Sequence, residues 1–455
     1  MFVPASKLLT SDRDGKTPVA CLAAGHVKSF ADLHAETADL AARIVARGRP
    51  RLVLACHSGY AFVCGMLAAF QAGCHVIVPP NVLPGMLDLF VSGDSPLLSD
   101  IVEQDGPQQM AIDGRRGREF AFRPLDPADC RFDFYTSGST GLPKQVPKSL
   151  KQIEDELVVL HGCFGDRLAG SATLGTVSHQ HIFGLYFKCL LPLCEGRPFF
   201  PGIFEIWEEL LAAAPRACSL VTSPAHLTRI PPLDPLRGED RMPVIFAAGG
   251  PLPFAAAAQA ARLFGPVPTE IFGSTETGAI ACRQQMTEAT PFRPLPGAET
   301  RTDAEGLLHV RAAYTAKGEW EAMNDLVTRF DDGGFLLTGR ASQFVKIEGK
   351  RISLLEIEQH LTNSSLVRDA AVFILPGVRD TLVAVVEPTT AGWEMHATLG
   401  AFRLGRELRK ALSGHLENAA LPRRWRFVAQ LPLNAQGKRQ QTVLNELFAE
   451  EGRDN

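Results

Sequence analysis

Short apolar runs alternate with stretches of helical composition over most of the chain, and this alternation is what most limits the fold. The runs that predict strands cover residues 53–56, 75–79, 220–223 and 244–248. A helix is predicted over 59–71, between the first two runs. Alternating strands and helices favour an α/β domain in which helices pack on a sheet.

The pattern changes after residue 340. Two helices and two strands are predicted beyond it, over 354–363, 370–375, 382–387 and 402–411. These elements are typical of a small α+β unit, and a chain of 455 residues has room for about two to four folding units. We therefore predict two domains, 1–340 and 341–455.

The composition excludes several classes of protein. Hydrophobic residues make up 45% of the chain and charged residues 21%, which is globular, and the net charge of −4 argues against a nucleic-acid-binding polycation. No apolar stretch approaches the ~18–20 residues of a membrane helix, and we expect no signal peptide. The ten cysteines are scattered without a C-x-x-C pair, so we expect reduced thiols in a cytoplasmic protein, without a disulfide framework or a zinc site.

The segment from Phe134 to Lys144, FYTSGSTGLPK, combines groups that bind an oxyanion. Two glycines allow a turn whose backbone N–H groups point inward, and such a concave set of amides binds anions. The hydroxyl and glycine residues of this loop are Thr136, Ser137, Gly138, Ser139, Thr140 and Gly141. The spacing is not that of a Walker P-loop. The composition alone fits a polyphosphate site and an ordinary polar surface loop equally well.

The stretch from Tyr135 to Lys144 resembles the signature loop of the adenylate-forming superfamily, which includes acyl-CoA synthetases, aryl-CoA ligases, luciferases and the adenylation domains of peptide synthetases. The resemblance implies a large N-terminal adenylate-forming domain with sheets and flanking helices, followed by a small mobile C-terminal domain. It also implies that ATP binds at this loop. Further motifs of the superfamily follow in the same order.

Two of these motifs precede the predicted metal ligand. HIFGL, from His181 to Leu185, resembles a segment in which the histidine walls the acyl pocket and gates the approach of the thiol. His179 is close by, but the spacing to Gly184 favours His181. The alternative for His181 is a packed core histidine. AAGGPLP, 247–253, resembles the segment that lies against adenine, so that Gly249 and Gly250 approach the nucleotide, although a tight turn explains it as well.

The segment IFGSTETG, from Ile271 to Gly278, is more specific. By the resemblance, Glu276 binds a Mg²⁺ ion that bridges the ATP phosphates, and Thr275 contacts the α-phosphate. Phe272 stands where the family stacks an aromatic ring on adenine, with Gly273 beside it in the same nucleotide-binding segment. A helix cap is the alternative for a lone glutamate here.

The last motifs flank the predicted domain boundary. Asp325 and Arg340 match residues that bind the ribose of ATP, and the DGG between them also predicts a hairpin turn. Lys438, in LPLNAQGKRQQ, matches the lysine that bridges the substrate carboxylate and the α-phosphate. Ser342 departs from the Asp or Lys usual at the pivot, and Gly349 matches a loop that helps to form the thiol tunnel.

Together the motifs imply an AMP-forming acid–thiol ligase with ATP and Mg²⁺. The short N-terminal part and HIFGL resemble small aryl-acid ligases, including those of aryl-polyene pigment pathways, so a hydroxybenzoate-like acid is expected; a medium- or long-chain fatty acid is the alternative. The acceptor is coenzyme A or the phosphopantetheine of an acyl carrier protein. Basic residues at 406–410 and at Arg423, Arg424 and Arg426 could dock either acceptor, although a solvated face explains them more simply. A non-catalytic nucleotide- or acyl-binding relative and a luciferase-like enzyme remain alternatives.

Overall fold

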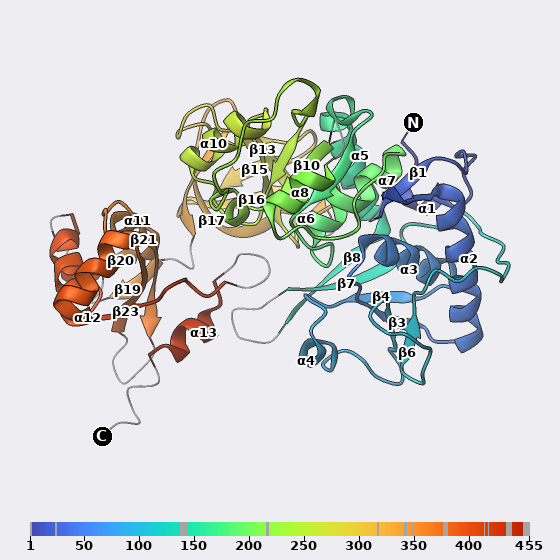
Figure 1. The fold of residues 1–455 in the computed structure, drawn as a ribbon, viewed down its shortest axis with the longest axis horizontal. Helices are drawn as coiled ribbons and strands as arrows, with labels where there is room; N and C mark the ends of the chain where they lie inside the picture. The colour runs from blue at the N-terminus through green and yellow to red at the C-terminus, as the bar shows by residue number, and fades with distance from the viewer. Residues whose placement is uncertain are drawn as a thin grey trace. The chain divides into compact units, whose positions relative to one another are not determined.

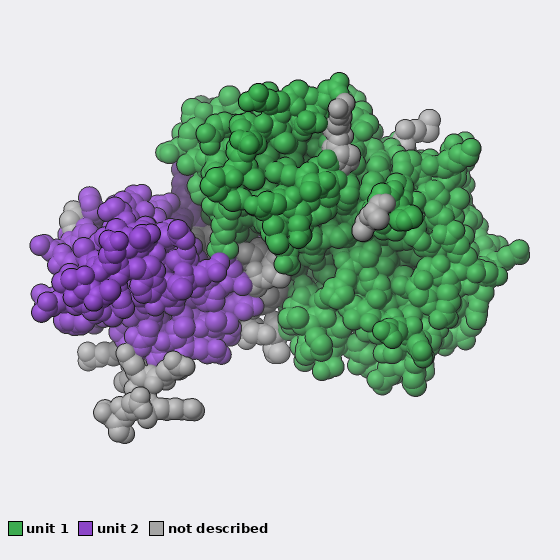
Figure 2. Space-filling view, viewed as in Figure 1, with its two compact units in different colours: residues 1–300, 310–321, 331–334 green, residues 301–309, 322–330, 335–455 purple. Residues whose placement is uncertain are grey.

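The computed structural model describes residues 2–22, 25–136, 143–214, 218–315, 318–340, 344–347, 350–375, 381–413, 415–416, 418–433 and 439–448. The chain forms two compact units, coloured separately in Figure 2: residues 1–300, 310–321 and 331–334, and residues 301–309, 322–330 and 335–455. Because this division is interleaved along the chain and is not a single cut, the boundary predicted after residue 340 stays a prediction. Each unit is described by itself.

The first sheet of the larger unit has the strand order β6-β5-β3-β4-β7-β8. Its strands are β3 (Arg51–Leu54), β4 (His75–Val78), β5 (Leu97–Ser99), β6 (Gln109–Ala111), β7 (Arg131–Thr136) and β8 (Lys144–Ser149). All neighbours are parallel except β7 and β8, which form an antiparallel pair at one edge. Strand β8 was not predicted from the sequence.

Helix α3 (Gly59–Gln71) packs beside β3 and β4, and α2 (Phe30–Arg47) packs against α3 (Figure 1). All residues of α3 are buried, which explains its nearly uniform apolar sequence, and Ser58 caps it by accepting a hydrogen bond from the Ala61 N–H. The helix predicted over 59–71 is confirmed.

The second sheet of this unit has the order β14-β13-β12-β11-β10-β9. Its strands are β9 (Ala172–Gly175), β10 (Cys218–Thr222), β11 (Ile245–Ala247), β12 (Thr269–Ser274), β13 (Gly278–Gln284) and β14 (Arg293–Pro294). Strands β9 to β12 are parallel, and β13 turns back antiparallel to β12. Helix α5 (Leu150–Leu168) follows β8 and shares one hydrophobic core cluster with residues of both sheets, including Phe132 and Phe246.

Shorter elements complete the larger unit. They are α1 (Ala5–Leu8), β1 (Pro18–Cys21), β2 (Val27–Ser29), α4 (Pro84–Leu87), α6 (Ile182–Gly184), the π-helix η2 (Leu185–Leu190), α7 (Leu191–Glu195), α8 (Trp207–Ala213), α9 (Pro224–Leu227), the 3₁₀ helix η3 (Gly238–Asp240) and α10 (Phe254–Phe264). Strands β1 and β2 pair antiparallel.

A four-stranded sheet, in the order β15-β16-β17-β18, has residues in both units. Its strands are β15 (Glu299–Thr302), β16 (Leu307–Arg311), β17 (Glu321–Arg329) and β18 (Phe335–Arg340). The remainder of the smaller unit is α+β, as predicted. Its elements are β19 (Phe344–Ile347), β20 (Lys350–Ser353), α11 (Leu354–Thr362), β21 (Val367–Leu375), β22 (Thr381–Pro388), α12 (Thr390–Ser413), the 3₁₀ helix η6 (Asn418–Ala420), β23 (Arg424–Phe427) and α13 (Gln441–Glu446).

The helix predicted over 402–411 is present. It belongs to α12, which is interrupted at Gly400, where φ is 78°. Within the part of the chain that the structure describes, no helix combines the length and apolar character needed to cross a membrane.

Candidate active site

The predicted phosphate loop joins β7 to β8. Its flanking residues Thr136 and Lys144 are direct partners across the antiparallel pair. Ser137, Gly138, Ser139, Thr140 and Gly141 lie outside the described residues. The described ends therefore bring Thr136 and Lys144 together at the edge of the first sheet.

Lys144 contacts the predicted metal ligand. Its Nζ donates a hydrogen bond to the Oε1 atom of Glu276 over 2.6 Å, although the two residues are 132 positions apart. The side chains are 63% and 35% exposed, so a ligand can reach the pair. Burial raises the pKa of Glu276, but hydrogen bonds from Lys144 and from the turn outweigh it, and the pKa lies below its ordinary value. Glu276 is therefore an ionised carboxylate that solvent and ligands can approach.

The turn that carries Glu276 lies between β12 and β13 and is fixed by its own hydroxyl groups. The Ser274 hydroxyl accepts from the Thr277 N–H, and the Thr277 hydroxyl accepts from the Ser274 N–H. Gly278 has a φ of 71°, a backbone angle that residues with a side chain rarely adopt. A Cβ atom on Gly273 would lie 2.0 Å from the Gly278 carbonyl oxygen, so this close approach requires glycine. Thr275 is half-buried within the turn.

A second lysine of β8 contacts the same turn and was missed in the sequence. Lys148 is only 3% exposed, and its Nζ donates to the backbone carbonyl oxygen of Glu276 over 3.0 Å. Side chains alternate along a strand, so Lys144 and Lys148 lie on one face of β8. Their spacing was the available signal, but it has meaning only once the segment is known to be a strand.

Glu156 of α5 binds the backbone directly after the turn, and it was also not predicted from the sequence. Its Oε1 atom accepts a hydrogen bond from the Ala279 N–H over 2.7 Å, and the side chain is buried. Burial raises the pKa of Glu156 to about 7, although the nearby Lys148 and the hydrogen bond from Ala279 lower it. Burial likewise lowers the pKa of Lys148, against the opposing effect of Glu156 and other carboxylates.

The residues predicted to contact adenine are partly accessible. The Phe272 ring is half-buried and packs against Phe292, with ring centroids 5.5 Å apart. Gly249 and Gly250 are exposed between β11 and α10, as the turn pattern predicted, and a Cβ atom on either would have no neighbour within 4 Å. Gly249 has a φ of 100°.

The two histidines of the HIFGL region differ in environment. His179 is buried and its Nε2 atom lies 3.0 Å from the Cys56 carbonyl oxygen; burial holds its pKa well below the ordinary value. His179 is therefore a packed core histidine. His181 is half-buried and precedes α6. A Cβ atom on Gly184 would lie 2.1 Å from the Ser178 carbonyl oxygen, so the close packing of this segment requires the glycine.

The predicted ribose residues belong to the smaller unit. Asp325 and Arg340 are direct partners across β17 and β18, and Asp325 is buried. The DGG turn between the strands is present: Asp332 accepts a hydrogen bond from the Gly334 N–H, and Gly333 has a φ of 81°. The hairpin reading is therefore confirmed, and it places the two predicted ribose residues side by side.

Lys438, Ser342 and Gly349 lie outside the described residues. Arg439, the residue after Lys438, is described and anchors the chain to the core of the small unit. Its guanidinium contacts Glu358 of α11 at 2.9 Å and Asp369 of β21 at 2.7 Å.

The basic residues near the C-terminus have structural partners. Arg426 donates to the Leu447 carbonyl oxygen, and the guanidinium groups of Arg424 and Arg426 lie over the Phe448 ring. Arg409 donates to the carbonyl oxygens of Leu421 and Pro422. Arg409, Arg424 and Arg426 therefore have structural contacts, whereas Arg406, Lys410 and Arg423 are exposed, as expected for a solvated face.

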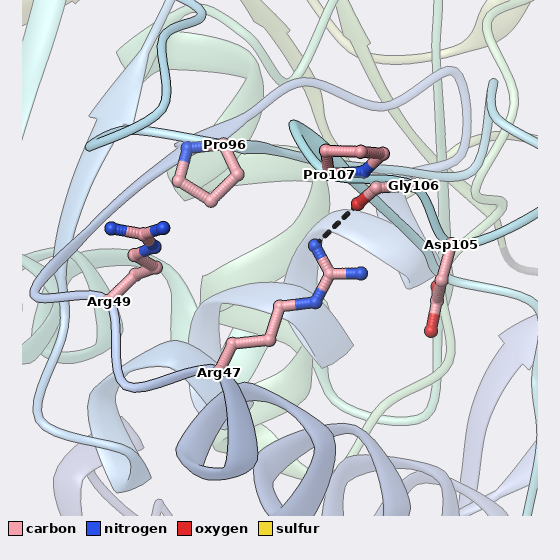
Figure 3. Close-up of a pocket in the computed structure, with 6 residues that line it drawn as sticks. All are labelled: Arg47, Arg49, Pro96, Asp105, Gly106 and Pro107. Carbon is pink, nitrogen blue, oxygen red and sulfur yellow. Dashed lines mark hydrogen bonds between the residues drawn. The ribbon is translucent and has the colours of Figure 1, made fainter.

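A cleft elsewhere on the larger unit contains none of the predicted site residues. Figure 3 shows Arg47, Arg49, Asp105 and Gly106 lining it, and the Arg47 guanidinium donates to the Gly106 carbonyl oxygen. Among the described residues, no group of three or more His, Cys, Asp or Glu side chains could hold a metal ion.

Comparison with known proteins decides the family. A model of the AMP-binding enzyme family matches residues 88–318, and a model of the AMP-binding enzyme C-terminal domain matches residues 356–438. The chain belongs to the AMP-binding enzyme family. This membership confirms the prediction of an adenylate-forming enzyme, and relatives named as ligases of acids with coenzyme A agree with the prediction of an AMP-forming acid–thiol ligase.

Named relatives of this AMP-binding enzyme include ligases with two kinds of acceptor. It is 28% identical over 312 residues to the 4-coumarate–CoA ligase of Cereibacter sphaeroides, covering 68% of this chain and 70% of the relative. It is 23% identical over 472 residues to the D-alanine–D-alanyl carrier protein ligase of Staphylococcus aureus, covering 90% and 92%. The fold matches the ATP-bound MatB from Rhodopseudomonas palustris with a TM-score of 0.79 at 21% identity, over 99% and 100% of the two chains. The predicted fold class is confirmed.

Proposed function

We propose that this AMP-binding enzyme joins a carboxylic acid to a thiol in two steps. In the first, a carboxylate oxygen attacks the α-phosphorus of ATP and the bond to pyrophosphate breaks. In the second, the thiol sulfur attacks the acyl carbon, AMP leaves with the bonding electron pair, and the thiol proton passes to solvent. No enzyme nucleophile is needed, because positioning and charge neutralisation supply the catalysis.

The observation that carries the proposal is the contact between Lys144 and Glu276. It joins the phosphate-loop lysine to the carboxylate turn after β12, so two motifs far apart in the sequence form one accessible site. In the absence of ATP, each charge has the other as its partner. When ATP binds, Lys144 can exchange the carboxylate for a phosphate oxygen, which keeps its charge paired.

A magnesium ion fits the chemistry of this site. Mg²⁺ is commonly held by one or two carboxylates together with substrate phosphate oxygens and water. Glu276 supplies one ionised, partly exposed carboxylate and would hold the ion. The ion would neutralise phosphate charge. The turn hydroxyls and Gly278 keep the carboxylate facing outward.

We infer the remaining nucleotide contacts from the resemblance of the motifs to the superfamily. We place the phosphates at Thr136, Lys144 and the loop between them, and the α-phosphate also at Thr275. Adenine is placed at Phe272, with the backbone of the neighbouring glycines Gly249, Gly250 and Gly273 close by. Asp325 and Arg340, which are partners across β17 and β18, would bind the ribose.

The catalytic role is assigned to Lys438, which would neutralise charge on the α-phosphate and the attacking carboxylate. Loss of such a charged contact should lower the adenylation rate on the order of 10²–10³-fold. His181 is placed at the wall of the acyl pocket.

We propose a small aryl acid, such as a hydroxybenzoate, as the substrate, and coenzyme A or the phosphopantetheine of an acyl carrier protein as the acceptor. The 4-coumarate–CoA ligase supports the first choice, and the D-alanyl carrier protein ligase keeps both acceptors open. A location in the cytoplasm, where ATP and coenzyme A are available, is part of this proposal.

The test is ATP–pyrophosphate exchange measured across a panel of aryl, cinnamyl and fatty acids. Exchange with aryl acids alone supports the proposal, and exchange with fatty acids alone would replace its substrate. Clear ATP binding without exchange for any acid would contradict acid activation and favour a binding-only relative. The Glu276→Gln variant keeps the shape of the side chain and removes its charge. Exchange that depends on the proposed site should therefore fall in this variant.

A further inference from the structure

Two lysines on one face of β8 hold two different parts of the same residue. Lys144 contacts the carboxylate of Glu276, and Lys148 contacts its backbone carbonyl oxygen. The first contact is exposed and can be exchanged for a ligand. The second is buried, because Lys148 is 3% exposed, so it is out of reach of a bound nucleotide. Lys148 therefore acts on the backbone of the turn and not on the substrate.

Glu156 binds the strand that follows this turn, β13. Its Oε1 atom accepts from the Ala279 N–H at 2.7 Å, three residues after Glu276. Helix α5 begins directly after β8, and its first turn is fixed by a capping box between Ser149 and Gln152. The strand that carries Lys148 and the helix that carries Glu156 thus form one continuous segment. Lys148 contacts the turn at Glu276, and Glu156 contacts the following strand at Ala279.

The β12–β13 pairing is irregular beside Ala279, which is the register partner of Gly273. The register of the two strands shifts between Phe272 and Gly273, and the shift accompanies a β-bulge or similar irregularity. Both polar backbone groups of Ala279 are bound by side chains: Glu156 accepts from its N–H, and the Tyr314 hydroxyl donates to its carbonyl oxygen over 2.7 Å. Side chains of α5 and of the loop after β16 thus fix Ala279, the second residue of the strand that follows the turn.

Glu156 lies so close to the backbone of Gly278 that this position requires glycine. A Cβ atom on Gly278 would lie 2.1 Å from the Glu156 Oε2 atom. Within the described residues, this oxygen has no hydrogen-bond partner and is buried. Lys148 and Glu156 are both buried, and each binds a backbone group in or directly after the Glu276 turn. Their hydrogen bonds therefore constrain the backbone around Glu276.

We propose that Lys148 and Glu156 are positioning residues that hold the Glu276 turn in the geometry that receives magnesium-bound ATP. The inference rests on the proposed function, because it takes Glu276 as the metal ligand. Neither side chain touches the nucleotide. Each acts through the backbone of the turn, and Tyr314 completes the set at Ala279.

The test measures ATP binding by calorimetry twice, once with excess MgCl₂ and once with EDTA. The ratio of the two affinities is the gain that magnesium supplies. Groups that orient a metal ligand commonly change metal affinity by about 10–100-fold when removed. We expect Lys148→Met and Glu156→Ala to lower the gain about 10-fold or more, while the affinity in EDTA stays within about twofold of the parent.

Three further variants separate positioning from general damage. Glu156→Gln keeps an oxygen that accepts from Ala279, so it should retain most of the gain. Tyr314→Phe removes one hydrogen bond without changing shape, so it should lose a smaller part of the gain, and it remains informative if the two larger changes prevent folding. Lys151→Met is the matched control on the same segment, because Lys151 is exposed and its ammonium group pairs with Asp155 of the same helix.

The proposal is overturned if Lys148→Met, Glu156→Ala and Tyr314→Phe keep the full gain. It is also overturned if they lose ATP affinity equally with magnesium and with EDTA, since that result would show general damage to the nucleotide site. A parent enzyme that binds no ATP under either condition would instead refute the proposed function. The two failures are therefore distinguishable.

Discussion

Gly278 offers the sharpest test of the geometry around the turn, through the substitution Gly278→Ala. The residue has a φ of 71°, and an added Cβ would lie 2.1 Å from the Glu156 Oε2 atom. The left-handed backbone costs an alanine about 1–2 kcal/mol. Glu156 must also move, which breaks its buried hydrogen bond from Ala279 at a cost of about 1–3 kcal/mol. The expected loss of stability is therefore about 2–5 kcal/mol.

Two neighbouring glycines separate these contributions. Gly249 has a φ of 100° but open space around its Cβ position, so Gly249→Ala should cost only the backbone strain, about 1–2 kcal/mol. Gly250 has open space too and no such φ, so Gly250→Ala should change stability by less than about 0.5 kcal/mol. The three variants should rank in that order.

The assay is the apparent melting temperature of the full chain, followed by calorimetry at a fixed scan rate. At roughly 2 °C per kcal/mol for a unit of this size, Gly278→Ala should melt about 4–10 °C below the parent. In a Glu156→Ala background the same change should cost only the strain, because the obstructing carboxylate is absent. If Gly278→Ala melts no lower than Gly249→Ala, the contact between Gly278 and Glu156 plays no part and the reasoning is wrong.

Three further predictions concern catalysis and pH. Lys438→Ala should lower the adenylation rate on the order of 10²–10³-fold but spare thioester formation from supplied acyl-adenylate; an equal loss of both half-reactions would contradict its assignment. Arg439→Ala should lower adenylation more than thioester formation, about 10-fold, because it releases the anchor beside Lys438; unchanged exchange rates would refute this. The pKa of Glu156 rises from its ordinary 4.5 to about 7 in the fold, so the folded chain binds the extra proton and stability falls as pH rises through this window. The melting temperature of the parent should therefore drop more between pH 5 and pH 8 than that of Glu156→Gln, and parallel curves would disprove the shift.

The sequence predicts well the elements whose pattern is uniform. Helix α3 was predicted with its observed limits, because a continuous apolar stretch bounded by Ser58 and Gly73 has few other solutions. Strand β8 was missed, because KQVPKS is polar and contains Pro147, which argues against a strand. The structure resolves the conflict by placing β8 at the edge of its sheet, where a proline is tolerated.

The site was predicted in part for a related reason. The motifs of the superfamily predicted Lys144 and Glu276 as members of one site, and the structure places them in contact. Lys148 and Glu156 were not predicted, because a lysine in a polar segment and a glutamate in an amphipathic helix are ordinary surface residues by pattern. Their partners, Glu276 and Ala279, are more than 120 positions away, and only the folded chain brings them together. The roles assigned to the site residues stay predictions.

The central claim, attack of a carboxylate on the α-phosphate of ATP, is tested most directly with an acid labelled with ¹⁸O in its carboxyl group. The enzyme is supplied with the acid that supports exchange, ATP, magnesium and a thiol acceptor, and the AMP is analysed by mass spectrometry. The account predicts that each AMP released with a thioester carries one ¹⁸O atom from the acid. Unlabelled AMP, or ADP and phosphate in place of AMP and pyrophosphate, would contradict it.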